Sequence, residues 1–482
     1  GALRFVTAPN YEAPTDTGTN NVYDVIVQVS DGFLSDTQAI AVSVTPVNDN
    51  TPVITSDGGG ATAAISLAEN TLAVTTVTAT DADLPAPTLT YTIIGGADSA
   101  RFSLNSSTGQ LSFVAAPNYE SPTDAGANNV YDVTVQVSDG TNTDTQAISV
   151  TITPVNDNTP VITSNGGGAT ANISIAENTT AVANVTASDA DLPAQTLTYS
   201  ISGGNDAAQF SIGSSSGVLS FITAPNFEAP GDFDANNVYE LIVQVSDGAL
   251  STTQAIAVTV SNVNEAPVLN AAPAVTLTPV AEDAGAPVGA VGTLVSALVD
   301  TVGGGGWDNV SDPDAGASTG MAVIGADTAS GTWYYTINGG SSWSALGTPS
   351  TASARLLAAD TQTRVYFAPT SNFNGSIANA LSFRAWDRTS GSDGGLADTN
   401  TNGGATAFSS GTDTAALTVT AVNDEQTLVT NTGATFAEGS VGNLITSTLL
   451  RTTDVDNTAA QLVYTLGSAP TVGTLYRNGV AL

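Results

Sequence analysis

The alternation of apolar and polar residues along the chain predicts β-strands. In "VYDVTVQVSDG", residues 130–140, Tyr and Val at every second position alternate with Asp, Thr, Gln and Ser. A period of two places the apolar row on one face of a sheet and the polar row on the other. "LTYTI" at 89–93 and "AISVTI" at 147–152 repeat the pattern, with clusters of Gly, Pro, Asn and Asp between the runs. Roughly seven short strands in about 100 residues are typical of an antiparallel β-sandwich.

Internal repeats divide the chain. "TAPNYE", "AAPNYE" and "TAPNFE" end at Glu12, Glu120 and Glu228, 108 residues apart each time, and the "NNVY…VQVSDG" phrases keep the same step. The predicted domains are residues 1–50, matching the second half of a repeat, the full repeats 51–158 and 159–265, a longer Gly-rich unit 266–425, and the start of a further unit, 426–482. We expect the chain to be an excerpt of a longer protein, because half a sandwich does not close a core.

The charge balance excludes several classes of function. The chain has 44 Asp plus Glu against 8 Lys plus Arg, and all eight basic residues are Arg. A net charge of −36 argues against nucleic acid and against anionic membrane surfaces as partners. The sequence has no Cys and no His, which removes thiol and imidazole chemistry. No apolar run approaches the ~18 residues of a membrane span.

The acids recur in fixed phrases at predicted strand ends. In residues 51–158 they lie in "AEN", "DAD", "PNYE", "SDG" and "NDN", and Arg101 is the only base. Asp and Asn commonly serve only as turn formers, so a single phrase carries little weight. Crowded carboxylates without bases repel one another, and Ca²⁺ prefers six to eight oxygen ligands. The recurrence in register therefore predicts hard-cation sites near the domain ends.

This order of motifs resembles a cadherin repeat. The resemblance runs through "VTATDADLPAPTLTYTI", "ARFSLNSSTGQLSF", "YDVTVQVSDG" and "ISVTITPVNDNTPVI", and it covers residues 1–265. It implies an all-β fold, a tandem array of cadherin/Ig-like Greek-key β-sandwiches in an extended rod. Residues 266–425 are similar to longer cadherin-like repeats of giant bacterial surface proteins. Residues 426–482, with "FAEG", "TDVDN" and "GTLYRNG", resemble the chondroitin-sulfate-proteoglycan-type repeat.

The resemblance implies Ca²⁺ ligands at four junctions between successive domains. At the first junction they are Glu12, Asn48, Asp49, Asn50, Asp81, Asp83 and Asp139. At the second they are Glu69, Glu120, Asn156, Asp157, Asn158, Asp189, Asp191 and Asp247. At the third they are Glu177, Glu228, Asn264, Glu265, Asp312, Asp314 and Asp387. At the fourth they are Glu282, Asn423, Asp424, Asp454 and Asp456.

Some positions depart from the family pattern. The family's Asp-Arg-Glu is Asn118-Tyr119-Glu120 here, and Pro154 occupies the first Asp position of the linker. Because ligands are missing, we expect one to three ions at each junction. Asn374 stands where Glu is expected, which predicts a weaker fourth site. No N-terminal Trp of the kind that adhesive cadherins exchange is found, so that adhesion mechanism is not carried over.

Catalysis is a poor fit to the sequence. Asp81 and Asp83 could be proposed as glycosidase carboxylates, but a pair repeated in every unit suits a structural ruler better than an active site. Ser residues have no His or Lys to activate them. The aromatic side chains of Trp333, Tyr334, Tyr335 and Trp343 could form a sugar-stacking platform, although core packing is the more common role of such residues.

The sequence therefore predicts a calcium-rigidified extracellular rod of a cell-surface or secreted adhesin that mediates cell–cell or cell–matrix attachment. The alternative is a self-assembling structural filament or a passive stalk. The expected partners are calcium, copies of the chain itself, and other cell-surface proteins or glycans. No enzymatic activity is expected.

Overall fold

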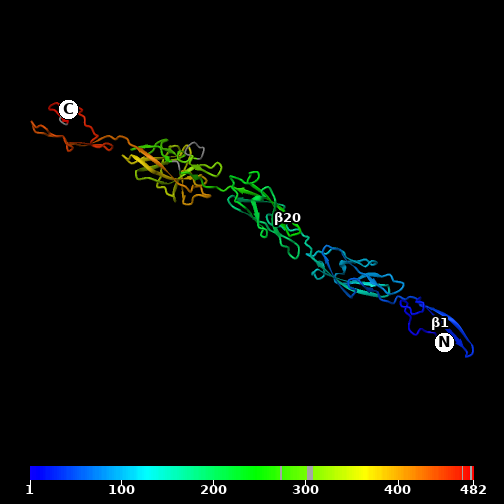
Figure 1. Ribbon diagram of the computed structural model, residues 1–482. Helices are drawn as coiled ribbons and strands as arrows, with labels where there is room; N and C mark the ends of the chain where they lie inside the picture. Colours follow the sequence, from blue (N-terminus) through cyan, green and yellow to red (C-terminus); the bar gives the residue numbers. More distant parts are fainter. Residues whose placement is uncertain (272–273, 301–307, 469, 478–479, 482) are drawn as a thin grey trace. The chain divides into compact units, whose positions relative to one another are not determined.

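The computed structural model describes residues 1–271, 274–300, 308–468, 470–477 and 480–481. Strands and loops account for almost all of this part of the chain, and its only helical elements are three single 3₁₀ turns, η1 (Ser99–Arg101), η2 (Ala207–Gln209) and η3 (Val295–Ala297). The prediction of an all-β protein is confirmed. Two compact units are formed, Gly1–Pro225 with Pro230–Val260, and Asn226–Ala229 with Ser261–Leu482 (Figure 1).

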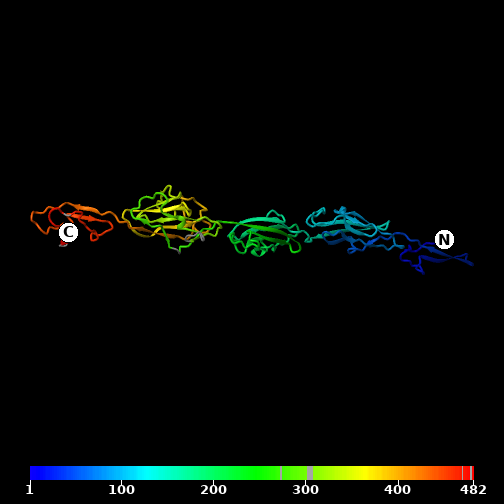
Figure 2. The same ribbon diagram turned by 90° about the horizontal axis from the view of Figure 1, so that it is seen from above.

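The second repeat illustrates how the alternating pattern builds a sandwich. One sheet has the strand order β4-β11-β10-β7, and a second has the order β5-β9-β8. This repeat is coloured blue to cyan in Figure 2. In β10, Tyr131, Val133, Val135 and Val137 are buried, and they belong to one hydrophobic core with residues of both sheets. The strands of residues 1–158 are β1 (Val22–Ser30), β2 (Ser35–Ser43), β3 (Val53–Ile54), β4 (Thr62–Ala68), β5 (Ala73–Thr76), β6 (Ala79–Thr80), β7 (Thr90–Gly95), β8 (Phe102–Leu104), β9 (Gln110–Phe113), β10 (Val130–Ser138) and β11 (Thr143–Thr153).

One strand pair of the second repeat is parallel, which the prediction of an antiparallel sandwich did not anticipate. β11 pairs with β4 in parallel, from Ala147 opposite Thr62 to Thr153 opposite Ala68. Before β4, β3 pairs with β6 in a separate two-stranded sheet. β4 then lies at one edge of the four-stranded sheet, beside β11, the last strand of the repeat. Their pairing leaves fewer backbone hydrogen-bonding groups exposed at that edge.

The third repeat copies this arrangement. Its sheets have the orders β13-β20-β19-β16, β14-β18-β17 and β12-β15. Gly109 and its counterpart Gly217 begin the phrases "GQL" and "GVL". Each has a φ near 70°, and a Cβ at either position would lie 2.0 Å from a carbonyl oxygen, so glycine is required there. The strands are β12 (Val161–Ile162), β13 (Thr170–Ala176), β14 (Ala181–Asn184), β15 (Ala187–Ser188), β16 (Thr198–Gly203), β17 (Phe210–Ile212), β18 (Val218–Phe221), β19 (Val238–Ser246) and β20 (Ser251–Ser261).

The second compact unit contains a larger sandwich. A seven-stranded sheet has the order β22-β33-β31-β26-β29-β32, with β23 also paired to β33, and a four-stranded sheet has the order β24-β30-β27-β28. Trp333 is buried in the core and packs on Phe367, with ring centroids 4.9 Å apart. Trp333 therefore serves core packing rather than a sugar platform. Trp343 is half-buried and meets Tyr366 edge-on.

The strands of the second compact unit are β21 to β37. They are β21 (Val268–Leu269), β22 (Val275–Thr276), β23 (Val280–Ala281), β24 (Thr293–Leu294), β25 (Val310–Ser311), β26 (Gly320–Ala326), β27 (Gly331–Thr336), β28 (Ser344–Ala345), β29 (Ala354–Ala358), β30 (Arg364–Pro369), β31 (Gly375–Trp386), β32 (Leu396–Ala397), β33 (Asp413–Thr420), β34 (Thr427–Asn431), β35 (Leu450–Thr453), β36 (Tyr476–Arg477) and β37 (Val480–Ala481). β34 pairs with β35, and β36 with β37, each as a separate two-stranded sheet.

Candidate metal centres

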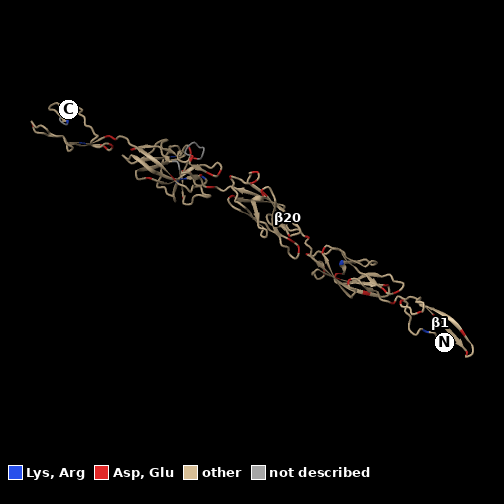
Figure 3. Ribbon diagram, in the orientation of Figure 1, with Lys and Arg blue, Asp and Glu red and all other residues tan. Residues whose placement is uncertain are grey.

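The Asp-x-Asp turns share one local geometry. In each, the first Asp accepts a hydrogen bond through Oδ1 from the backbone N–H of the second, at 2.8 to 3.0 Å. Each turn directly follows a short strand, β6, β15, β25 or β35. The pairs are Asp81–Asp83, Asp189–Asp191, Asp312–Asp314 and Asp454–Asp456. This bond fixes the turn, so two carboxylates leave the end of a strand together. Figure 3 marks the acidic positions in red along the ribbon, many of them in loops.

At the first junction, five of the predicted carboxylates gather into two overlapping sets. One oxygen each of Glu12, Asp49 and Asp83 lies within 4.8 Å of the other two. The same holds for Asp81, Asp83 and Asp139. Asp83, which is 3% exposed, belongs to both sets. A carboxylate with two oxygens can serve two neighbouring cations in this position.

Three oxygen atoms at the first junction are buried and accept no hydrogen bond from any described residue. They are Oδ1 of Asn48, Oδ2 of Asp81 and Oδ2 of Asp139. The side-chain nitrogen of Asn48 donates to the backbone oxygen of Asp139 at 3.2 Å, which fixes the orientation of that amide. Buried oxygens without donors are costly, and a bound cation is one way to satisfy them.

The second junction holds two separate carboxylate sets of the same dimension. They are Glu69, Glu120 and Asp157, and Asp189, Asp191 and Asp247. Glu69 is 2% exposed, and its two oxygens accept backbone N–H groups of Tyr119 at 2.7 Å and Val155 at 2.8 Å. These bonds tie the "AEN" turn to the loop that carries Glu120 and to the start of the linker.

The side chain of Asn156 lies between the carboxylates of Asp191 and Asp247. With its nitrogen turned toward them, the amide donates to both, at 3.3 and 3.2 Å. The same amide also carries a carbonyl oxygen, which could face a cation if the side chain turned over.

Four acids of the first two junctions have pKa values below the ordinary value of an Asp side chain. The side-chain amide of Asn50 holds the pKa of Asp83 below its ordinary value, against desolvation. Desolvation pushes the pKa of Asp139 upward, but the backbone N–H groups of Thr141 and Asn142 outweigh it and the pKa is lowered. The pKa values of Asp191 and Asp247 are lowered in the same way.

The donor set fits a hard divalent cation. All gathered ligand atoms are carboxylate oxygens, and the buried side-chain oxygen of Asn48 lies with them at the first junction. The sequence has neither Cys nor His, so sulfur and imidazole ligands are excluded. Several carboxylates with flexible geometry and amide oxygens suit Ca²⁺ better than Mg²⁺, which demands a strict octahedron and retains water.

In the second compact unit, the corresponding acids are arranged differently. Asp312, Asp314 and Asp387 are not gathered into a set of the same dimension, although all three are described residues. The side-chain nitrogen of Asn264 instead donates to Oδ2 of Asp387 at 3.0 Å. The backbone N–H of Glu265 donates to Oδ2 of Asp314 at 2.8 Å. Burial raises the pKa of Asp312 above its ordinary value, and the negative charges of Asp314 and Asp387 raise it further.

Asn262 adds a second amide to this group. Its side-chain nitrogen lies 2.9 Å from Oε1 of Glu228 and 2.9 Å from Oδ1 of Asp314, so it bridges two carboxylates as a donor. Amide hydrogens therefore meet Asp314 and Asp387, as the amide of Asn50 meets Asp83 at the first junction. Glu177 is buried within the first compact unit, 1% exposed.

The acids of the fourth junction are only partly gathered. Glu282 is 2% exposed and accepts the backbone N–H of Val422 at 2.6 Å and the side chain of Asn374 at 2.7 Å. The backbone N–H of Asp424 donates to Asp456 at 2.6 Å. Burial raises the pKa of Asp424, and the charge of Asp283 is the next cause.

Two further predicted residues lie at the fourth junction. Asn423 accepts a long hydrogen bond from Asn457, at 3.5 Å through its side-chain oxygen. Asp454 also contributes to the raised pKa of Asp424. Oδ2 of Asp424 is buried without a donor among the described residues.

Sequence reasoning missed three side chains that contact the predicted ligands or lie near them. They are Asn70, Asn262 and Asp283. Aligning the repeats could have found them, because Asn262 occupies the linker position of Pro154, and Asp283 the position of Asn70. Asn70 and Asp283 directly follow the singled-out acids Glu69 and Glu282, and Asn262 lies two residues before Asn264.

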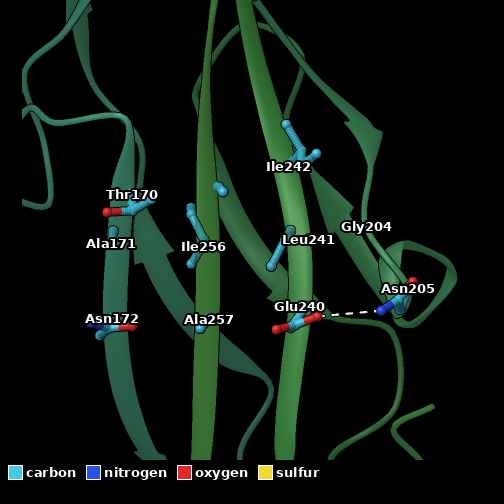
Figure 4. A pocket seen from close by; sticks show the side chains of 11 residues that line it. Thr170, Ala171, Asn172, Gly204, Asn205, Glu240, Leu241, Ile242, Ile256 and Ala257 are labelled. Atoms are coloured by element: carbon cyan, nitrogen blue, oxygen red, sulfur yellow. Dashed lines mark hydrogen bonds between the residues drawn. The ribbon is translucent and has the colours of Figure 1, made fainter. Parts of the chain in front are cut away.

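A groove of about 620 Å³ lies away from the junctions, on the outer face of β13, β20 and β19 (Figure 4). Small side chains such as Ala257 line it, and Glu240 is the titratable group in its lining. Asn205 donates to Glu240 at 3.3 Å.

Comparisons with known proteins point to one family. A family model described as "Cadherin domain" matches residues 63–153 and 171–261. Protocadherin Fat 1 of Homo sapiens is 31% identical over 283 residues, which are 55% of this chain and 6% of that protein. Cadherin-related family member 3 of Homo sapiens is 27% identical over 261 residues, 52% of this chain and 29% of that protein. The chain thus spans under a third of the length of either relative.

A solved structure of "Protocadherin Gamma B2 extracellular cadherin domains 1-5" overlaps 85% of this chain and 68% of its own, with 20% identity and a TM-score of 0.47. Cadherin repeats are non-enzymatic extracellular domains that bind Ca²⁺ at the linkers between them. Within the described residues, no helix has the length and apolar character needed to cross a membrane.

Proposed function

Because the chain carries tandem cadherin domains, we propose that it is a calcium-rigidified extracellular segment of an adhesion protein, which mediates cell–cell or cell–matrix attachment. Ca²⁺ binds at the linkers and limits the motion of each domain against the next. The carboxylate sets of the first two junctions carry this proposal, together with the buried oxygens that lack a donor among the described residues.

The cation contributes charge neutralisation. Without it, Glu12, Asp49 and Asp83 repel one another across a linker that contains no basic residue. With it, acids from the domain before the linker, the linker itself and the domain after it are joined to one ion. The binding energy is then available only when these three segments stay together, which restrains the linker.

Calcium titration of the full chain tests the proposal. After treatment with chelator, Ca²⁺ should slow amide hydrogen exchange in residues 47–50 and 155–158, and small-angle scattering should show a stiffer envelope. Unchanged exchange and an unchanged envelope would reject the proposal.

Asp83→Asn provides the matched test of the site. It removes one charge from both sets of the first junction, so the Ca²⁺ concentration for half-maximal protection of residues 47–50 should rise by at least about tenfold. Glu240→Gln is the control, because it removes one charge from an exposed sheet face that belongs to no acidic set. The control should leave the half-point in place.

The adhesive role needs its own measurement. Beads coated with the chain should cluster in Ca²⁺ and disperse in chelator if copies of the chain attach to each other. Ordered end-to-end or lateral assemblies under electron microscopy would instead favour the structural filament, and monomers without clustering would favour a passive stalk. The relatives found are animal cadherins and protocadherins. A bacterial source and a proteoglycan-type last unit remain predictions from the sequence.

A further inference from the structure

Asn70 reaches the second linker from the same turn as Glu69. Its side-chain nitrogen donates to Oδ2 of Asp157. The turn is anchored on both sides, because Glu69 donates its backbone N–H to Thr153 at 3.1 Å and Asn70 donates its own to Pro117 at 2.9 Å. The position of the Asn70 amide is therefore set by backbone hydrogen bonds, independently of Asp157.

Asp157 is held from two directions. Asn70 donates to Oδ2, and Asn158 donates to Oδ1 at 3.1 Å. One carboxylate oxygen of Asp157 lies within 4.8 Å of an oxygen of Glu69 and of an oxygen of Glu120. Arg101, the only basic residue of the repeat, forms no hydrogen bond with any of these three side chains. Like charges at this separation favour rotation of the exposed Asp157 side chain away from the other two. The two amides oppose that rotation.

The backbone at Asn70 needs a residue that tolerates a left-handed conformation. Its φ is 63°, and the residues at the same place in the following domains, Asn178 and Asp283, have φ values of 61° and 60°. Glycine would satisfy this backbone equally well. All three positions nevertheless carry a short polar side chain, which the backbone alone does not require.

We propose that Asn70 is a positioning residue whose amide holds the Asp157 carboxylate against Glu69 and Glu120, so that the three bind one divalent cation together. The inference rests on the calcium-binding function proposed above. It assigns to the third residue of the "AEN" phrase the task of orienting a ligand that lies 87 residues further along the chain.

Asn70→Gly tests the amide without straining the backbone. In the full chain, hydrogen exchange of residues 155–158 is followed by mass spectrometry as Ca²⁺ is added. The half-point of protection should rise by about three- to tenfold, because one hydrogen bond to a charged group is lost. Asn178→Gly is the control for the general cost of glycine, and it should shift the half-point of residues 155–158 by less than about twofold.

The outcomes separate the inference from the function beneath it. An unchanged half-point in Asn70→Gly, with clear Ca²⁺ protection in the parent, would overturn the positioning role and leave calcium binding intact. Equal loss of thermal stability in both variants, measured in chelator, with no change of half-point would assign Asn70 a structural role only and would also overturn it. If the parent itself shows no protection by Ca²⁺, the calcium function fails and the inference fails with it.

Discussion

Two sets of acids in this molecule begin from the same turn and end differently. Asp189 and Asp191 follow β15, and Asp312 and Asp314 follow β25, with the same internal hydrogen bond. The first pair gathers with Asp247 to within 4.8 Å of one another. The second pair does not gather with its counterpart. The Asp-x-Asp motif determines the turn, whereas residues elsewhere in the chain determine whether its carboxylates gather with a third acid.

The difference lies in what faces the carboxylates. Asn262 donates its side-chain nitrogen to Asp314 and Glu228, whereas Pro154, at the equivalent linker position, has no side-chain donor. Asn264 donates its side-chain nitrogen to Asp387, and the same nitrogen lies 3.2 Å from the backbone oxygen of Glu265. This carbonyl acceptor holds the Asn264 amide with its hydrogens toward the acid.

The largest expected effect comes from removing one acid from each set. Asp191→Asn should raise the half-point for Ca²⁺ protection of residues 155–158 by at least about tenfold, because a gathered ligand is lost. Asp314→Asn should shift the half-point of residues 262–265 by less than about twofold. Hydrogen exchange of the full chain with added Ca²⁺ measures both. Equal shifts would abolish the distinction between the two sets.

Asn264→Asp should make the stability of the second unit depend on a cation. The variant replaces a donor to Asp387 by a carboxylate, so in chelator it should destabilise the unit by about 1–2 kcal/mol. Ca²⁺ should restore much of that loss. All four Trp lie between residues 307 and 386, so the fluorescence of urea unfolding reports on this unit alone. A loss of stability that Ca²⁺ fails to restore would contradict the expectation.

Arg388→Gly tests a backbone difference between the sets. Gly140 and Gly248 follow the corresponding acids with φ values above 100°, whereas Arg388 adopts a φ of 68° with a side chain attached. Relief of this strain should stabilise the unit by about 0.5–1 kcal/mol, followed by Trp fluorescence in urea. A decrease in stability would show that the Arg388 side chain contributes more than its backbone costs.

The smallest expected effect concerns an acid of the second unit outside the candidate sites. Burial raises the pKa of Asp413 above its ordinary value of 3.8. Its stabilising contribution is therefore present below pH 3.8 and is lost as the pH rises through the folded-state pKa. Asp413→Asn should flatten this part of the pH dependence of unfolding, measured by Trp fluorescence between about pH 4 and pH 6. An unchanged slope would remove Asp413 as its source.

The sequence by itself determined the all-β fold and the two repeats, residues 63–153 and 171–261, that match the cadherin domain. Alternation such as that of Tyr131, Val133 and Val135 is a local property, because side chains point to opposite faces of a strand in turn. The Asp-x-Asp turns are also local, since one side chain bonds the backbone two residues on. Both depend only on neighbouring residues in the chain, and their repetition at a fixed spacing allowed them to be predicted.

Only the tertiary structure decided which acids meet and what faces them. The approach of Asp157 to Asn70 and the bridge from Asn262 to Asp314 depend on where separate loops arrive in space. The parallel pairing of β4 with β11 likewise brings together strands from the two ends of the repeat. Whether an Asn offers oxygen or nitrogen to a carboxylate is set by its remaining contacts, such as the backbone oxygen of Glu265 beside Asn264. A sequence motif records the residue type, while the chemistry of the site follows from the direction in which the side chain is held.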